Sequence, residues 1–252
     1  MKNIVGIIGG LGPSATVDLY KRITKNTQAA KDQDHLRIII DSHPQIPDRT
    51  EAILNGGPSP VPYLQESLDL LESAGARVIA VPCVTAHYFL PELAPGHETR
   101  ILDMIRETAL ELQRLNITEV GILSTSGTAK SGIFDERLKR HGINGVIPDE
   151  IGLNRQMEAI YGPEGIKAGA QFEKSPQNKA AFLEIIEQFR SQGIFQVIMG
   201  CTEIPLCLDQ NDTESMLINP VEVLAQAVVR EAKVIQQRKE MPQTTGVGQM
   251  MH

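Results

Sequence analysis

The chain has 252 residues, of which 41% are hydrophobic, so it is long enough for one large domain or two small ones and apolar enough for a packed core. Its 24 basic and 31 acidic side chains give a net charge of −7, which argues against a general nucleic-acid binder, because such a protein needs a basic surface to neutralise phosphates. A small anionic substrate stays open, because a few cations in a cleft outweigh distant surface charge.

The N-terminal apolar run, residues 4–8, is shorter than the hydrophobic region of a secretory signal, and glycines and a proline follow it. No stretch of the sequence has the length of a membrane-spanning helix. We therefore expect a cytoplasmic protein with no membrane partner. The three cysteines suit that compartment, where thiols stay reduced.

Short β-rich runs alternate with helical patterns along the chain. In chain order, strands are predicted at residues 4–8, 36–41, 77–82, 119–124, 145–147 and 196–200, and helices at 16–29, 62–74, 99–115, 177–192 and 221–239. Most of the strands are continuous apolar runs, as in strands that are covered on both faces. This alternation predicts an α/β fold with parallel sheets.

Two halves of the sequence carry the same order of motifs. The first segment IVGIIGGLGPSAT corresponds to EVGILSTSGTAKSG, and RVIAVPCVTAHYF corresponds to QVIMGCTEIPLCL. Val5 precedes Cys83 by 78 positions, and Val120 precedes Cys201 by 81. The repeat predicts two pseudo-symmetric, Rossmann-like α/β domains, each with a parallel β-sheet flanked by helices. The expected divisions are residues 1–101 plus 209–240, with a C-terminal helix that returns to the first domain, then 102–208, and a flexible tail at 241–252.

Cys83 and Cys201 each end an apolar strand, at equivalent positions of the two halves. Ligands bind at the carboxyl ends of parallel strands, and backbone N–H groups at a helix start lower a thiol pKa and bind a carboxylate. We therefore interpret the two cysteines as an acid/base pair that moves a proton on a small carboxylate. A lone cysteine in an apolar run is usually a core residue, and this interpretation is kept for Cys207, which has no counterpart.

Zinc binding, disulfide redox chemistry and nucleophilic catalysis are the alternatives to an acid/base pair. Cys83 and His87 stand four apart, and Cys201 and Cys207 six apart, without the close pairs of structural zinc sites, so no metal is expected. A disulfide redox centre needs a C-x-x-C motif, which the chain lacks. Nucleophilic catalysis by one cysteine stays open but leaves the other unexplained. His87 is expected to pack behind the Cys83 loop.

The glycine-rich turn at residues 10–15, GLGPSA, fits the dinucleotide-binding fingerprint loosely, and Asp41 ends the next strand, where a ribose-binding acid could lie. Pro13 removes one N–H from the turn. We therefore favour a tight strand-to-helix turn that lines a cleft, with Ser14 or Thr16 capping the helix.

Two cations lie in stiffened loops. Arg49 follows two prolines after the second strand, a position that suits bidentate recognition of a carboxylate. Lys167 follows two glycines and a proline in YGPEGIK. Each could instead lie in solvent, as most charged side chains do, with Arg49 paired to Asp48 or Glu51.

Taken in order, the segments IVGIIGGLGP, HPQIPDRT, PCVTAH, GILSTSGT, YGPEGIKAG and GCTEIPL resemble the aspartate/glutamate racemase family, closest to its aspartate racemase branch, over nearly the whole chain. The resemblance implies an active site between two domains, cofactor-independent racemisation by one cysteine from each domain, and a homodimer. Cys83 and Cys201 are then the bases, and Arg49 and Lys167 recognise the distal carboxylate or tune the thiols. The substrate-binding residues that it implies are Gly10, Arg49, Val84, Thr85, Thr128, Lys167, Thr202 and Glu203.

The sequence departs from the family at Val84, where the family usually has Asn in C-N-T-A. The Asn side chain contacts the polar head of the substrate. This change leaves the substrate open between aspartate, glutamate and another carboxylate.

The mechanistic hypothesis is a two-base proton exchange without pyridoxal phosphate or another cofactor. One cysteine thiolate removes the Cα proton, and the other thiol donates a proton from the opposite face. Backbone N–H groups and the hydroxyls of Thr85 and Thr202 would stabilise the enediolate-like charge. The alternatives are a dicarboxylate isomerase or decarboxylase of the same superfamily, a dicarboxylate-binding protein without turnover, and an NAD-dependent enzyme.

Overall fold

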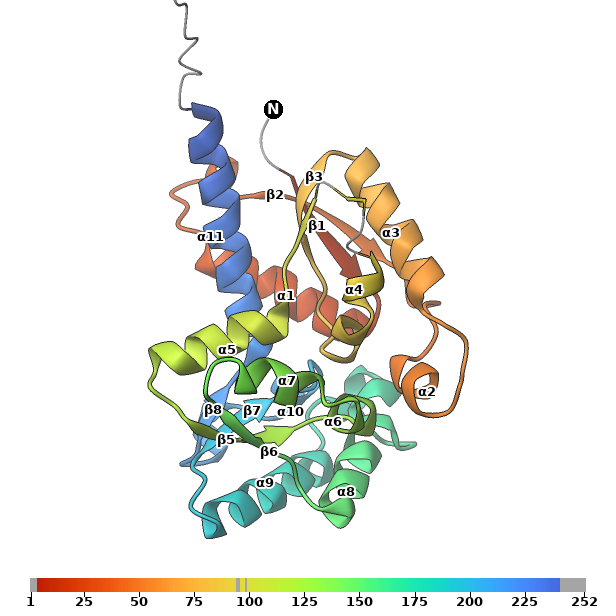
Figure 1. The fold of residues 1–252 in the computed structure, drawn as a ribbon, viewed down its shortest axis with the longest axis vertical. Helices are drawn as coiled ribbons and strands as arrows, with labels where there is room; N and C mark the ends of the chain where they lie inside the picture. Colours follow the sequence, from red (N-terminus) through yellow and green to blue (C-terminus); the bar gives the residue numbers. More distant parts are fainter. Residues whose placement is uncertain (1–3, 94–95, 98, 241–252) are drawn as a thin grey trace, which may run out of the picture.

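The computed structural model describes residues 4–93, 96–97 and 99–240 of the chain. It contains two four-stranded sheets, with strand orders β2-β1-β3-β4 and β6-β5-β7-β8, and every strand pairing in the described residues is parallel. The second order repeats the first, strand for strand. The predicted fold class, two pseudo-symmetric α/β units with parallel sheets, is confirmed (Figure 1).

The first sheet and its helices come from the N-terminal part of the chain. The strands are β1 (Ile4–Gly9), β2 (Arg37–Ser42), β3 (Ala76–Ala80) and β4 (Arg100–Ile101). The helices are α1 (Pro13–Asn26), α2 (Arg49–Leu54), α3 (Val61–Ser73) and α4 (Leu90–Leu93), with 3-10 turns η1 (Asp32–Asp34) and η2 (Thr85–Tyr88).

The second sheet follows helix α5 (Met104–Arg114). Its strands are β5 (Glu119–Leu123), β6 (Asn144–Val146), β7 (Gln196–Met199) and β8 (Met216–Ile218). The helices are α6 (Ser126–Ser131), α7 (Ile133–Lys139), α8 (Glu150–Tyr161), α9 (Pro176–Ser191) and α10 (Ile204–Cys207), with turns η3 (Ile166–Ala168), η4 (Ala170–Phe172) and η5 (Gln210–Asp212). The last helix is α11 (Pro220–Glu240).

Strand β1 is apolar throughout because helices cover both faces of its sheet. Successive side chains of a strand point to opposite faces. Val5 and Ile7 join the core cluster that includes residues of α1, α5 and α11, whereas Ile4 and Ile8 join the cluster with α3. The continuous apolar run is therefore the mark of a central strand.

Helix α11 returns to the first sheet after the second sheet is complete. It packs along α1 and α5 and contacts β1 and β3 (Figure 1). Leu224 and Val228 of α11 are fully buried in the same cluster as Val5 and Ile7. The exact domain boundaries stay a prediction, and the tail predicted at 241–252 lies outside the described residues.

The helix predicted at 99–115 is wrong at its beginning. Arg100 and Ile101 form β4 beside β3, and the helix begins only at Met104. Asp103 is its N-cap, with a carboxylate that accepts 3.0 Å hydrogen bonds from the N–H groups of Ile105 and Arg106. The short edge strands β4 and β8 carry too few residues for a periodic signal. Across the described residues, every helix is too short or too polar to cross a membrane.

Candidate active site

A small cavity lies between the two halves, beyond the carboxyl ends of β3 and β7. Its volume is about 10 Å³, room for roughly one water molecule. The cavity is lined by Arg49, Cys83, Val84 and Thr85 from the first half and by Thr125, Tyr161, Lys167, Cys201, Thr202 and Glu203 from the second. The structure therefore brings both cysteines and both predicted cations to one place.

Cys83 lies in a tight turn between β3 and η2. The Cys83 N–H donates to the Val81 carbonyl at 2.8 Å, and the Cys83 carbonyl lies 2.8 Å from Nδ1 of His87. Nε2 of His87 accepts from the Met104 N–H at 3.0 Å, so the proton of the neutral ring lies on Nδ1. Burial lowers the pKa of His87, against the opposing charge of Asp103. His87 thus packs behind the Cys83 loop, as the sequence suggested.

Val84, the departure from the family motif, is buried with two sets of neighbours. It lines the cavity beside Cys83, and it also belongs to the core cluster of α1, α5 and α11. An apolar wall therefore stands where the family motif carries an amide.

Cys201 follows β7 and faces a carboxylate. Its thiol donates to Oε2 of Glu203 at 3.0 Å, and the Thr202 hydroxyl donates to the same oxygen at 3.2 Å. Burial raises the pKa of Cys201, and the charge of Glu203 raises it further, while Lys167 opposes them. Cys201 is therefore a protonated thiol at neutral pH.

Lys167 is largely buried and holds the other oxygen of this carboxylate. Its Nζ lies 2.6 Å from Oε1 of Glu203 and 3.2 Å from the Leu11 carbonyl. Burial lowers the pKa of Lys167, but the negative charge of Glu203 and its hydrogen bond to Nζ act against burial, and the pKa is raised overall. The ammonium therefore stays charged in the cavity wall.

Arg49, at the beginning of α2, is a buried cation of the first half. Its guanidinium donates to the carbonyls of Leu11 at 2.9 Å, Pro47 at 3.0 Å and Ile46 at 3.2 Å. Burial by itself lowers the pKa of Arg49. The interaction with Cys83 is the largest of several effects that oppose burial, and the pKa is raised overall. The pairing with Asp48 or Glu51 that would have placed Arg49 in solvent is not formed; Asp48 instead caps α2.

The glycine turn is closed by its own threonine. The Gly10 N–H donates to the Thr16 hydroxyl at 3.0 Å, which donates to the Gly12 carbonyl at 3.0 Å. A Cβ at Gly12 would overlap Oε1 of Glu203, so glycine lets this turn approach the site. Gly10, with φ +85°, lies outside the cavity lining, and its contact with substrate stays a prediction.

Three threonine hydroxyls join the two halves beside the cavity. Thr85 of η2 lies 2.8 Å from Thr128 and 3.2 Å from Thr125, oxygen to oxygen, and Thr125 and Thr128 are 3.2 Å apart. Thr85 and Thr125 line the cavity, whereas Thr128 stands behind them. The predicted contact of Thr128 with substrate is untested.

Sequence reasoning missed two lining residues, Thr125 and Tyr161. Tyr161 donates to Oδ2 of Asp48 at 2.9 Å, across the two halves, and its ring centre lies 5.5 Å from Nζ of Lys167. Burial and the charge of Asp48 raise the pKa of Tyr161, so its hydroxyl stays a donor. The available signals were its place at the start of YGPEGIK and, for Thr125, its position as N-cap of α6.

Among the described residues, one group has the composition of a metal site, and it lies away from this cavity. Asp69 and Glu72 of α3 and His97 offer ligand atoms within 4.8 Å of one another. His97 Nδ1 already lies 2.6 Å from Glu72, and its Nε2 lies 2.7 Å from the Gln65 amide.

Cys207 is buried in a core cluster, with its sulfur 3.7 Å from the Ser175 carbonyl.

The chain matches known proteins over most of its length. The model of the Asp/Glu/Hydantoin racemase family matches residues 8–228. The chain therefore belongs to the Asp/Glu/hydantoin racemase family. The prediction that it is an amino-acid racemase, an isomerase, is confirmed by this membership.

Individual relatives cover nearly the whole chain. The aspartate racemase of Picrophilus torridus is 33% identical, with a TM-score of 0.82 over 92% of this chain and 94% of that one. An aspartate racemase homologue from Pyrococcus horikoshii is 25% identical, with a TM-score of 0.72 over 92% of this chain and 100% of that one. The broad specificity amino-acid racemase RacX of Bacillus subtilis is 25% identical over 90% of this chain and 96% of its own.

Proposed function

We propose that this protein racemises an acidic amino acid, aspartate in the first place, by a cofactor-independent exchange of protons between Cys83 and Cys201. The observation that carries the proposal is the convergence of the two cysteines on one cavity from equivalent strands of two sheets. Inversion at Cα needs a proton acceptor on one face and a donor on the other, and two halves that face each other supply both.

The surroundings of the two cysteines support different roles at the start of the reaction, one as acid and the other as base. Cys201 donates its proton to Glu203, so it begins as the acid. The role of base then goes to Cys83, which shares the cavity with the Arg49 cation. In this state it removes the Cα proton while Cys201 returns one to the opposite face, and the reverse reaction starts from the exchanged protons.

Charge in the cavity wall supports an acidic substrate. Arg49 and Lys167 are two buried cations, and only one carboxylate, Glu203, stands among the lining side chains. In this proposal the hydroxyls of Thr85 and Thr202, which line the cavity, donate to charge that develops on the substrate carboxylate, and for this Thr202 gives up its hydrogen bond to Glu203. The 33% identity to the aspartate racemase of Picrophilus torridus favours aspartate over glutamate.

The test follows deuterium uptake at Cα and chiral composition for D- and L-aspartate and D- and L-glutamate. We expect wild type to interconvert the aspartate enantiomers, and Cys83→Ser and Cys201→Ser each to lower the rate by about 10³-fold. Cys207→Ser is the matched control and should keep the wild-type rate, because its sulfur lies in a core cluster. Full racemisation by either of the first two variants contradicts the two-base scheme.

The same assay separates the other functions on this fold. Binding of aspartate without exchange at Cα would indicate a binding protein. Turnover of maleate or a malonate without racemisation would indicate an isomerase or decarboxylase.

We also propose a cytoplasmic location and a homodimer. All three cysteines are free and lie among the described residues, as is usual in a reducing compartment. The homodimer follows from the family resemblance alone, and sedimentation equilibrium tests it.

A further inference from the structure

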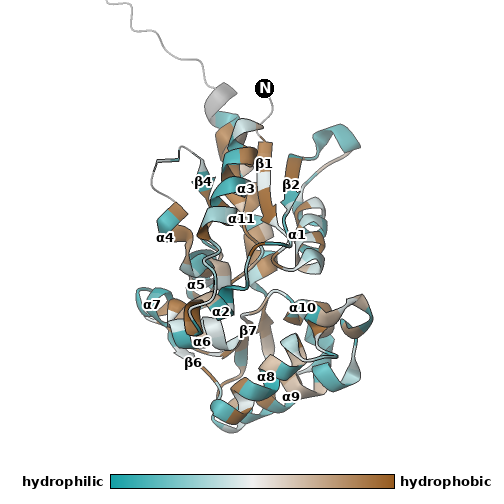
Figure 2. Ribbon diagram, turned by 90° about the vertical axis from the view of Figure 1, so that its right-hand side faces the viewer, coloured by the Kyte–Doolittle hydropathy of each residue, from teal (hydrophilic) through white to brown (hydrophobic). Residues whose placement is uncertain are grey.

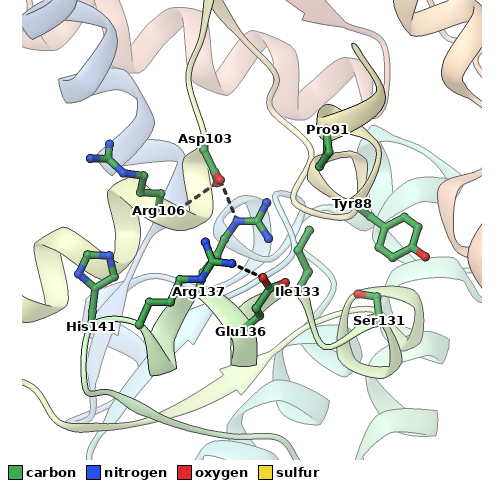
Figure 3. A pocket seen from close by; sticks show the side chains of 10 residues that line it. Tyr88, Pro91, Asp103, Arg106, Ser131, Ile133, Glu136, Arg137 and His141 are labelled. Atoms are coloured by element: carbon green, nitrogen blue, oxygen red, sulfur yellow. Dashed lines mark hydrogen bonds and ion pairs between the residues drawn. The ribbon is translucent and has the colours of Figure 1, made fainter. Parts of the chain in front are cut away.

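A second, larger cavity lies on the seam between the two halves. Its volume is about 400 Å³, and it opens between the η2–α4 segment of the first half and helices α5 and α7 (Figure 3). None of its lining residues lines the cysteine cavity. A volume of this size falls within the range of pockets for small molecules.

Arg137 of α7 provides the main polar group of this second cavity. Its Nε donates to Oδ2 of Asp103 at 2.8 Å, and its side chain is 17% exposed. The described residues offer no hydrogen-bond partner to its two terminal amino groups. Figure 3 shows this guanidinium beside Asp103, and both residues line the cavity. A guanidinium held by Nε alone presents a two-pronged donor to an anion.

Two further arginines stand at the rim. Arg106 is 55% exposed, and its ion pair with the adjacent residue Glu107 is long, at 3.3 Å. Arg140 is exposed and pairs with Glu136 at 2.5 Å. Both are free to turn toward a bound anion at little cost, because exposed ion pairs contribute little stability.

Apolar side chains form part of the wall, beside the polar side chains of Ser131, Glu136 and His141. The ring of Tyr88 and the side chain of Ile133 both line the cavity, and Tyr88 is 46% exposed. A ligand with an apolar or planar group that covers a half-exposed aromatic ring removes apolar surface from water, which favours binding. The cavity thus combines an anion-binding group with a surface for an organic body.

We propose that this cavity is a second ligand site, for a small organic anion that carries a carboxylate or a phosphate. The anion accepts hydrogen bonds from the terminal amino groups of Arg137, and the organic body packs on Tyr88 and Ile133. Such a ligand contacts both halves of the chain, because Tyr88 belongs to the first and Arg137 to the second.

The test uses phenyl phosphate, benzoate and phenol as probes on the full chain, by calorimetric titration. We expect at least one of the two anions to bind, and phenol, which lacks the charge, to bind at least tenfold more weakly. Preference for phenyl phosphate or for benzoate tells which anionic group the site takes, and either preference supports the proposal.

Variants locate the binding. Arg137→Lys keeps the charge beside Asp103 but loses the two-pronged donor, and we expect it to weaken binding of the anion at least tenfold. Arg190→Gln is the matched control, a partly buried arginine paired with Glu214 at 2.9 Å far along the chain, and should bind as wild type does. Thermal unfolding with each probe confirms that the Arg137→Lys protein is folded.

Three results overturn the proposal. They are binding of neither anion at millimolar concentration, equal binding to wild type and Arg137→Lys, and binding that is lost in Lys167→Met but kept in Arg137→Lys. The last result would place the probe in the cysteine cavity. These outcomes are separate from those for racemisation, because no readout here depends on turnover.

Discussion

Cys83 and Cys201 occupy equivalent places in the two halves, yet opposite charges face them. Arg49 stands by the first, and Glu203 accepts the proton of the second at 3.0 Å. The backbone is pseudo-symmetric but the electrostatics of the site are not. In the proposed two-base scheme, a protonated Cys201 makes Cys83 the first base, so we expect the charged neighbours to decide which enantiomer reacts without a prior proton exchange.

Glu203→Gln tests this assignment at the level of a single charge. Burial and the Glu203 carboxylate raise the pKa of Cys201, and Lys167 opposes them, so removing the carboxylate charge should lower that pKa. We expect alkylation of Cys201 by iodoacetamide, in a Cys83→Ser, Cys207→Ser background, to begin at lower pH than in the parent. Glu214→Gln, which removes an exposed carboxylate, is the control. An unchanged or higher onset would contradict the assignment.

The sequence repeat was enough to single out both cysteines, because their equivalent positions do not depend on side-chain contacts. Thr125 and Tyr161 were missed because their roles arise only when the two halves meet. Tyr161, for example, finds Asp48, a partner 113 positions away in the chain. The Lys167–Glu203 ion pair has the same origin, since a gap of 36 positions carries no local signal.

Among the elements, η2 connects Cys83 to the rest of the fold. His87 in this turn receives the N–H at the beginning of α5 and donates to the Cys83 carbonyl. The His87 side chain is fully buried, and as long as its ring is neutral this burial does not desolvate a charge. The turn is therefore fixed by a group that can be titrated.

His87→Gln should change the dependence of stability on pH. The folded pKa of His87 is lowered, so below about pH 6.5 the unfolded chain binds a proton that the folded chain does not, and the unfolding free energy falls by up to about 1.4 kcal/mol per pH unit. Glutamine does not titrate, so the stability difference between wild type and variant should shrink as the pH falls from 7 toward 5. Urea unfolding at several pH values measures it, and a constant difference would refute the role of His87.

The elements that sequence patterns predicted well are those with continuous apolar runs. β1 and β7 gave continuous apolar runs, and both are buried along most of their length. The helices with one apolar face gave a periodic pattern. The error at residues 99–103 arose because a two-residue strand is defined by its neighbour β3 and not by its own sequence. Prediction failed where pairing, rather than composition, decides the conformation.

At the scale of the whole molecule, the small volume of the cysteine cavity limits how substrate can enter. Room for about one water molecule does not admit an amino acid, so we expect the halves to separate before substrate enters. The Tyr161–Asp48 hydrogen bond joins the two halves, and Tyr161 lines the cavity. We expect this contact to break when the cavity opens.

Tyr161→Phe should therefore populate the open form more. The ring over Lys167 is kept, and only the hydrogen bond to Asp48 is lost. We expect Cys83 to be alkylated several-fold faster without substrate, as measured by mass spectrometry of the labelled peptide. Tyr20→Phe, on the exposed side of α1, is the control and should react like wild type. Equal rates in both variants would show that this hydrogen bond does not hold the halves closed.

The return of α11 to the first sheet, seen beside α1 in Figure 2, also fixes an order of events during synthesis. The strands of that sheet leave the ribosome before those of the second sheet, and α11, which packs in one cluster with Val5 and Ile7, is made only after both sheets. Until residue 220 and beyond have emerged, this apolar face of the N-terminal half lacks the cover that α11 adds to α1 and α5. The half that is translated first is thus the half that finishes folding last, and in the nascent chain it is the one exposed to chaperones and to aggregation.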